Sequence, residues 1–86
     1  MEKAFVLEYL SDPTDDTSSS DVLGVYKTKE EAQKVMKKEF DTLFEYLEIS
    51  DEDISDYNAK LYEDDTQSSI CHYGSYYCWT IYEFEI

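Results

Sequence analysis

The stretch that decides the fold is residues 28–47, TKEEAQKVMKKEFDTLFEYL. Thr28 and Glu31 form the capping-box pattern, in which the hydroxyl and the carboxylate each satisfy a backbone N–H. Downstream, apolar residues recur at helical spacing, with charged residues on the opposite face. The apolar positions are Ala32, Val35, Met36, Phe40, Leu43 and Leu47. We therefore predict a helix that starts at Thr28, runs to about Leu47 or Glu48 and lays its apolar stripe on a sheet.

Segments of strand character lie on both sides of this helix. Residues 3–10 and 22–26 have strand patterns, and we expect the polar stretch from Ser11 to Asp21 between them to be a mobile loop. In the first strand Phe5, Leu7 and Tyr9 share one face. The N-terminal half of the chain therefore predicts two strands followed by the helix.

After the helix, Ser50-Asp51-Glu52-Asp53 predicts a short helical turn, because acids are favourable at a helix N-terminus. Residues 57–63 alternate as in a strand, and Glu63–Gln67 has turn composition. The remaining segments, 68–73 and 76–86, predict a hairpin that turns at Gly74-Ser75.

The predicted order is ββαβββ, an α+β fold: an antiparallel β-sheet of four to five strands with one long helix packed on one face. Its 86 residues suit a single domain, 1–86. One point is open in the last strand, where Trp79 and Ile81 lie on one face and Tyr82 and Phe84 on the other. A bulge near Tyr82, or a sheet covered on both faces, would reconcile them.

The charge is extreme for a small domain. Twenty-one acids oppose seven bases, all of them Lys, for a net charge of −14. Free nucleic acid and anionic membranes would be repelled, so the expected partner is a basic protein. The apolar run at the start breaks at Glu8, too soon for a signal-peptide core, and no apolar stretch approaches the roughly 20 residues that span a bilayer. We expect a cytoplasmic protein, monomeric or a small homo-oligomer.

Catalytic patterns are missing from the sequence. His72 is the single histidine, Gly24 and Gly74 are the two glycines, and no arginine is present to clamp a carboxylate or phosphate. The chain is therefore expected not to be an enzyme.

A local group of metal-binding residue types lies in the last hairpin. With the turn at Gly74-Ser75, Cys71 would face Cys78 across the ribbon, while alternation places His72 on the other face. A zinc site completed by a carboxylate, or a cross-strand disulfide, would fit the two sulfurs. The favoured interpretation is two small half-buried hydrophobes without a cofactor, and zinc is the minority alternative.

The tyrosines of the same hairpin cannot all face one core. They are Tyr73, Tyr76, Tyr77 and Tyr82. Tyrosine is enriched at protein interfaces and is also a good strand former on a half-wet sheet face, so both roles stay open.

The acids gather after the middle of the helix. Residues 39–65 contain eleven acids and one lysine, Lys60, for a local charge of −10. Carboxylates held in rows can imitate the charge of duplex DNA toward a Lys- and Arg-lined groove. The expected partner-binding acids are Asp51, Glu52, Asp53, Asp56, Glu63, Asp64 and Asp65, with Tyr57 and Tyr62 as anchors. The alternatives are a zinc-stabilised interaction module and an acidic housekeeping adaptor that imitates no nucleic acid.

Residues 24–32, GVYKTKEEA, and residues 79–84, WTIYEF, resemble small acidic proteins of phages and mobile elements in low-GC bacteria. The size and acidity are also similar to anti-CRISPR proteins, several of which inhibit Cas9 by occupying its DNA- or guide-binding surfaces. This resemblance implies a non-enzymatic inhibitor of a Cas9-like effector in the host bacterial cell. It assigns no role to any individual residue.

Overall fold

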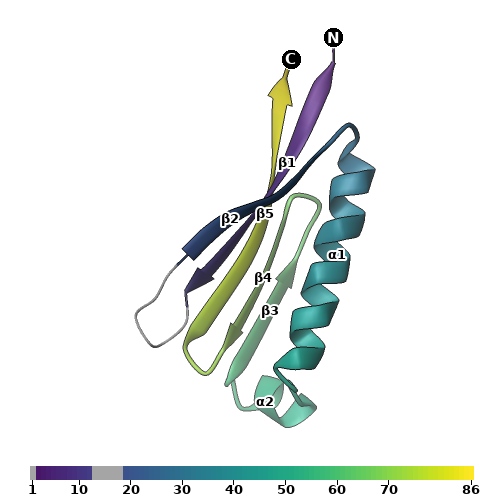
Figure 1. Ribbon diagram of the computed structural model, residues 1–86. Coiled ribbons are helices and arrows are strands. Elements are labelled where there is room, and N and C mark those ends of the chain that lie inside the picture. The colour runs from purple at the N-terminus through teal and green to yellow at the C-terminus, as the bar shows by residue number, and fades with distance from the viewer. Residues whose placement is uncertain (1, 13–18) are drawn as a thin grey trace.

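The computed structural model describes residues 2–12 and 19–86. The elements are β1 (Lys3–Asp12), β2 (Ser19–Tyr26), α1 (Lys29–Tyr46), α2 (Asp51–Ser55), β3 (Ala59–Glu63), β4 (Gln67–His72) and β5 (Ser75–Glu85). The five strands form one antiparallel sheet in the order β2-β1-β5-β4-β3, and α1 lies along one of its faces (Figure 1). The predicted α+β fold with ββαβββ order is confirmed.

Helix α1 begins and ends where the sequence predicts. Thr28 is the N-cap, and its Oγ1 accepts a hydrogen bond from the backbone N–H of Glu31 at 3.2 Å. The reciprocal box is formed at α2 instead, where Ser50 and Asp53 each accept from the other's backbone N–H at 3.1 Å. These caps satisfy N–H groups that have no partner inside the helices.

The core lies between α1 and the helix-facing side of the sheet. Leu7 of β1, Ile70 of β4 and Trp79 of β5 are its largest fully buried side chains. The Trp79 ring lies 5.2 Å from that of Tyr9 and 5.9 Å from that of Phe40, so it packs between sheet and helix. The apolar stripe of α1 supplies the other wall with Ala32, Met36 and Phe40 buried and Val35, Leu43 and Leu47 partly buried against them.

Strands β1 and β2 are longer than predicted. Leu10 pairs with Ser20 and Ser11 with Ser19, so the ladder continues through residues assigned to a loop. Polar side chains do not stop it, because ladder hydrogen bonds are made by the backbone. The predicted mobility of the loop concerns residues 13–18, which lie outside the described residues. Strand β3 is shorter than predicted and starts at Ala59, because Tyr57 has a φ of 61° that no strand accommodates.

The last hairpin turns one residue earlier than predicted. His72 pairs with Ser75, so the two-residue loop is Tyr73-Gly74, and both of its φ angles are positive, at 49° and 87°. Such angles define a type I′ turn. As a consequence Cys71 lies opposite Tyr76, and the predicted pairing of Cys71 with Cys78 is wrong.

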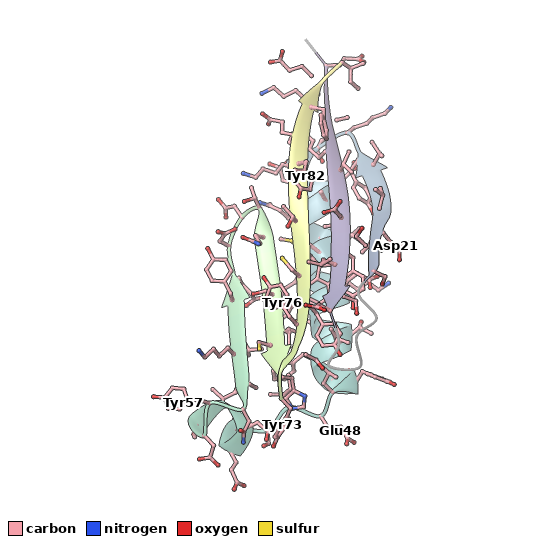
Figure 2. The ribbon with its side chains drawn as sticks, turned by 90° about the vertical axis from the view of Figure 1, so that its left-hand side faces the viewer. Asp21, Glu48, Tyr57, Tyr73, Tyr76 and Tyr82 are labelled. Carbon is pink, nitrogen blue, oxygen red and sulfur yellow. The ribbon has the colours of Figure 1, made fainter. Side chains whose placement is uncertain are left out.

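Strand β5 pairs with β1 and β4 without a register shift, so the bulge considered near Tyr82 is absent. In the pairing of β1 with β2, the register shifts between Leu7 and Glu8. The sheet is covered by α1 on one side, and we call its other side the open face. Figure 2 looks onto the open face, with Tyr76 and Tyr82 in front of the sheet and α1 behind it.

Among the described residues, neither helix combines the length and the apolar character required to cross a bilayer.

Candidate interaction surface at the acidic end

The nine predicted partner-binding residues form two groups at opposite ends of β3. One group, on and after α2, is Asp51, Glu52, Asp53, Asp56 and Tyr57, and the other, at the β3–β4 turn, is Tyr62, Glu63, Asp64 and Asp65. Tyr62 and Glu63 are the last two residues of β3, and Ala59, Lys60 and Leu61 of the same strand lie between the two groups, a span of about 10 Å. The fold therefore does not bring the predicted residues into one site.

Asp53 is used inside the molecule. Its Oδ1 accepts a hydrogen bond from the Tyr73 hydroxyl at 2.8 Å, and its Oδ2 accepts from the Ser50 N–H and lies 3.5 Å from His72 Nε2. The bonds from the Ser50 N–H and from Tyr73 hold the pKa of Asp53 below its ordinary value. This carboxylate fastens α2 to the β4–β5 turn, so we do not assign it to a partner.

The turn group is also tied to its own surroundings. Asp64 Oδ2 accepts from the Tyr62 hydroxyl at 2.6 Å, and its Oδ1 accepts from the backbone N–H groups of Thr66 and Gln67 at 2.8 Å. These bonds, that from Tyr62 first, lower the pKa of Asp64, and the same contact raises the pKa of Tyr62. Asp64 thus shapes the turn between β3 and β4.

Two further contacts join this turn to α1. Lys37 Nζ lies 3.2 Å from Glu63 Oε1, and Gln33 Nε2 donates to the Asp65 carbonyl at 3.0 Å. Within α1, Lys37 Nζ also lies 3.1 Å from Asp41 Oδ1. The hydrogen bonds to Asp41 and Glu63 raise the pKa of Lys37. The turn group is therefore partly neutralised and clasps the helix to the sheet edge.

The remaining acids gather where α1 ends and α2 begins. Residues 39–59 contain eight acids and no lysine. We call the following exposed residues the acidic end: Glu45, Tyr46, Glu48, Asp51, Glu52, Asp56 and Tyr57. Tyr46 and Tyr57, with exposed fractions of 80% and 82%, are the most exposed large hydrophobic side chains in the described part of the chain.

Strained backbone is confined to the same end. Glu48, Tyr57 and Tyr73 have positive φ angles of 52°, 61° and 49°, and no other described non-glycine residue does. Figure 2 shows the three at one end of the molecule. The left-handed conformation costs a non-glycine residue about 1–2 kcal/mol. Glycine would be the more stable choice at such positions, so this end is not optimised for stability alone.

Tyr57 has one of these positive φ angles, and its side chain makes no contact within the described part of the chain that would offset the strain. Its N–H donates to the Ile54 carbonyl at 3.2 Å, and the Asn58 N–H donates to the Asp53 carbonyl at 2.8 Å. This is the Schellman ending of α2, in which the residue at Tyr57 is usually glycine. The ring makes no aromatic contact or hydrogen bond with the described residues and stands in solvent.

Electrostatics at the end of α1 are also unfavourable for folding. The last turn of the helix contains no basic residue, while Glu45 and Glu48 lie at its negative pole. Like charge at a helix terminus costs about 0.3–1 kcal/mol. Five of the seven lysines lie between residues 27 and 38, so the molecule is polarised along α1.

The predicted metal-binding group is dispersed. Cys78 is buried and its Sγ accepts a hydrogen bond from Gln67 Nε2 at 3.1 Å, whereas Cys71 lies diagonally across the ladder, and both thiols are free. His72 points to the helix-facing side, where its ring packs edge-on against Tyr73 at 4.6 Å. Within residues 2–12 and 19–86, no three His, Cys, Asp or Glu side chains form a group that could hold a metal ion.

Three members of the acidic end were not among the predicted residues: Glu45, Tyr46 and Glu48. The signal available in the sequence was Tyr46, an aromatic residue that falls outside the apolar stripe of the helix. No family model, no curated protein and no solved structure matches the chain. The resemblance to phage-encoded inhibitors therefore stays a prediction.

Proposed function

We propose that the chain is a non-enzymatic inhibitor of the anti-CRISPR type, whose acidic end binds a basic nucleic-acid-binding surface of a Cas9-like effector. By occupying that surface it would block the access of DNA or RNA. The observation that carries the proposal is the acidic end, where exposed carboxylates and two exposed tyrosines follow one another in a stretch, residues 39–59, that contains no lysine.

The acidic end lowers the stability of the fold. Positive φ at Glu48 and Tyr57, and acids at the negative pole of α1, each cost folding free energy. Strain of this kind clusters at functional sites. Tyrosine rings flanked by carboxylates suit a partner rich in arginine, because guanidinium groups stack on aromatic faces and pair with carboxylates.

The acidic end also replaces the wider site expected from the sequence. Four of the nine residues, at the end of β3 and in the β3–β4 turn, lie beyond a stretch of about 10 Å of β3 and make internal contacts. The proposed contact residues are Asp51, Glu52, Asp56 and Tyr57 of the original set, with Glu45, Tyr46 and Glu48 added.

The proposal is tested by competition. Purified guide-loaded Cas9 is mixed with a fluorescent target duplex, and the chain is titrated in while duplex binding is measured by anisotropy. We expect the chain to displace the duplex, and to do so less well as ionic strength rises, because exposed charges are screened within about 8 Å at physiological salt. Unchanged duplex binding at saturating chain, with guide-free Cas9 equally unaffected in guide loading, would overturn it.

A further inference from the structure

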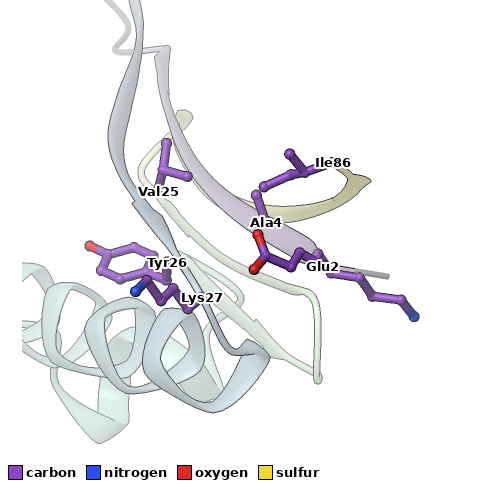
Figure 3. A pocket seen from close by; sticks show the side chains of 7 residues that line it. Glu2, Ala4, Val25, Tyr26, Lys27 and Ile86 are labelled. Carbon is purple, nitrogen blue, oxygen red and sulfur yellow. The ribbon is translucent and has the colours of Figure 1, made fainter.

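The open face presents a second surface with different chemistry. Strand pairing aligns Val25 of β2, Val6 of β1 and Tyr82 of β5 in one row across the sheet. The next row toward the chain termini pairs Ala4 with Phe84 and is apolar, whereas the next row in the other direction contains Val22, Glu8 and Thr80. We call the following exposed residues the open-face patch: Leu10, Val22, Val25, Tyr76, Tyr82 and Phe84. Figure 3 shows the end of this surface, where Val25 and Ala4 lie on the side of the sheet away from the helix and Tyr26 lies on the helix side.

Charge is scarce on this surface. A third of all residues in the chain are charged, yet the described residues of the five strands place three charged side chains on the open face: Glu8 and Asp12 of β1, and Lys60 of β3. Glu8 is half-buried and its Oε1 accepts a hydrogen bond from the Tyr82 hydroxyl at 3.3 Å. Depletion of charge together with aromatic side chains is the composition of an interface core.

The exposed area is of the size that an interface needs. Val25 and Val22 are 64% and 61% exposed and Phe84 is 53% exposed. With aromatic side chains of about 200 Å² each, the open-face patch offers roughly 400 Å² of apolar surface, to which half-buried Val6 adds. A standard interface takes about 800 Å² from each partner, and about 65% of a homodimer interface is apolar, or roughly 500 Å². The open-face patch supplies most of that.

We propose that the open face binds a second copy of the chain, sheet against sheet. The low charge of the open face favours a second copy of the chain over a basic partner. Two copies, each with a net charge of −14, can approach only where carboxylates are few, and the open face is such a surface. A basic partner would gain nothing from the open-face patch and would bind where the carboxylates are.

The geometry suits a two-fold dimer. A sheet face can pack on its own copy at about 10 Å with strands crossed by about 30°, and the same patch then serves both chains. Because α1 covers the opposite side of the sheet, both acidic ends stay accessible in the dimer. The inference is thus independent of the proposed function.

Analytical ultracentrifugation of the full chain, at concentrations up to about 200 µM, tests the proposal. Interfaces of this size have Kd values that are micromolar at the weakest, so a dimer would form at these concentrations. We expect a concentration-dependent doubling of mass. The dimer should become tighter between about 0.1 M and 1 M NaCl, as the Debye length falls from about 10 Å to 3 Å and repulsion between the copies is screened. Association of the acidic end with a basic partner should respond to salt in the opposite direction.

Val25→Lys is the informative variant, because it removes patch surface while lowering the repulsive net charge. We expect it to weaken dimerisation at least tenfold. Tyr46→Lys is the matched control, with the same added charge at an exposed aromatic position on α1, and should dimerise as the parent does. Thermal unfolding of both variants verifies that they are folded. A monomer at every concentration and salt, weaker association at high salt, or a Val25→Lys dimer equal to the parent would each overturn the proposal.

Discussion

Replacing Glu48 by glycine should make the protein more stable. Glu48 follows the C-cap Leu47, has a φ of 52° and donates its N–H to the Glu45 carbonyl at 3.1 Å, as the residue after a helix end does. Two costs are removed at once, the left-handed conformation of a residue with a Cβ and a negative charge at the negative pole of α1.

The magnitude follows from these contributions. Relief of the left-handed conformation is worth about 1–2 kcal/mol, from which about 0.5–1 kcal/mol is subtracted for the greater freedom of glycine in the unfolded chain. Removing the charge adds about 0.3–1 kcal/mol. The net gain for Glu48→Gly is about 1 kcal/mol, which corresponds to a rise of about 4–8 °C in Tm for a domain of this size.

Glu48→Gln separates the two contributions, because it removes the charge and keeps the Cβ. Thermal and urea unfolding of both variants should rank them Glu48→Gly above Glu48→Gln above the parent. If Glu48→Gly were no more stable than Glu48→Gln, the left-handed strain assigned to residue 48 would be refuted.

Three other changes probe the fold. Tyr57→Gly should likewise raise Tm, since it relieves a φ of 61°, and it should weaken partner binding in a pull-down; a lower Tm would contradict the assigned Schellman ending. Ile70→Ala should lower the free energy of unfolding, measured in urea, by about 2–5 kcal/mol, because it opens a cavity in the core that contains Trp79. A decrease below about 1 kcal/mol would show that Ile70 is not buried in the core. Asp53 and Asp64 have folded pKa values below their unfolded values, so the stability they provide is present above about pH 4 and is lost as pH falls through the folded pKa. Asp64→Asn should therefore unfold in acid with a smaller change in Tm between pH 6 and pH 3 than the parent, and an identical change would argue against its role in the turn.

The sequence predicts the fold well where local signals agree. Thr28 and the helical spacing from Ala32 to Leu47 locate α1, and alternation around Leu7 and Trp79 assigns the faces of β1 and β5 correctly. These signals are strong because one face of each element must be buried.

The hairpin register could not be predicted for a physical reason. The expected and observed pairings of β4 with β5 differ by two residues, and a shift of two leaves every side chain on the same face. Apolar patterning therefore cannot distinguish the two registers, and only the turn residues could. The observed turn, Tyr73-Gly74, has a tyrosine at positive φ, where Asn, Asp or Gly is preferred, so its sequence does not predict it.

The candidate site was only partly predictable. The acids of residues 51–65 follow one another closely in the sequence, which does not show that β3 separates Asp56 from Asp64. Nor does the sequence show that Asp53 and Asp64 accept internal hydrogen bonds. The open-face patch was signalled by Tyr82 and Phe84, which alternate out of phase with Trp79. Its extent required knowledge that β2 lies beside β1.

A double charge reversal at the end of α1 tests whether the acidic end binds the partner. Glu45→Lys with Glu48→Lys should stabilise the fold, because cations are favourable at the end of α1, while reducing affinity for guide-loaded Cas9. Four units of charge at about 0.5 kcal/mol each amount to about 2 kcal/mol, or roughly thirtyfold in Kd. Asp21→Lys with Glu85→Lys carries the same change in net charge at exposed positions away from the acidic end and serves as the control. We expect a higher Tm and a thirtyfold weaker Kd for the first pair, and near-parental binding for the control. Equal losses in both pairs, or parental affinity in the first, would contradict it.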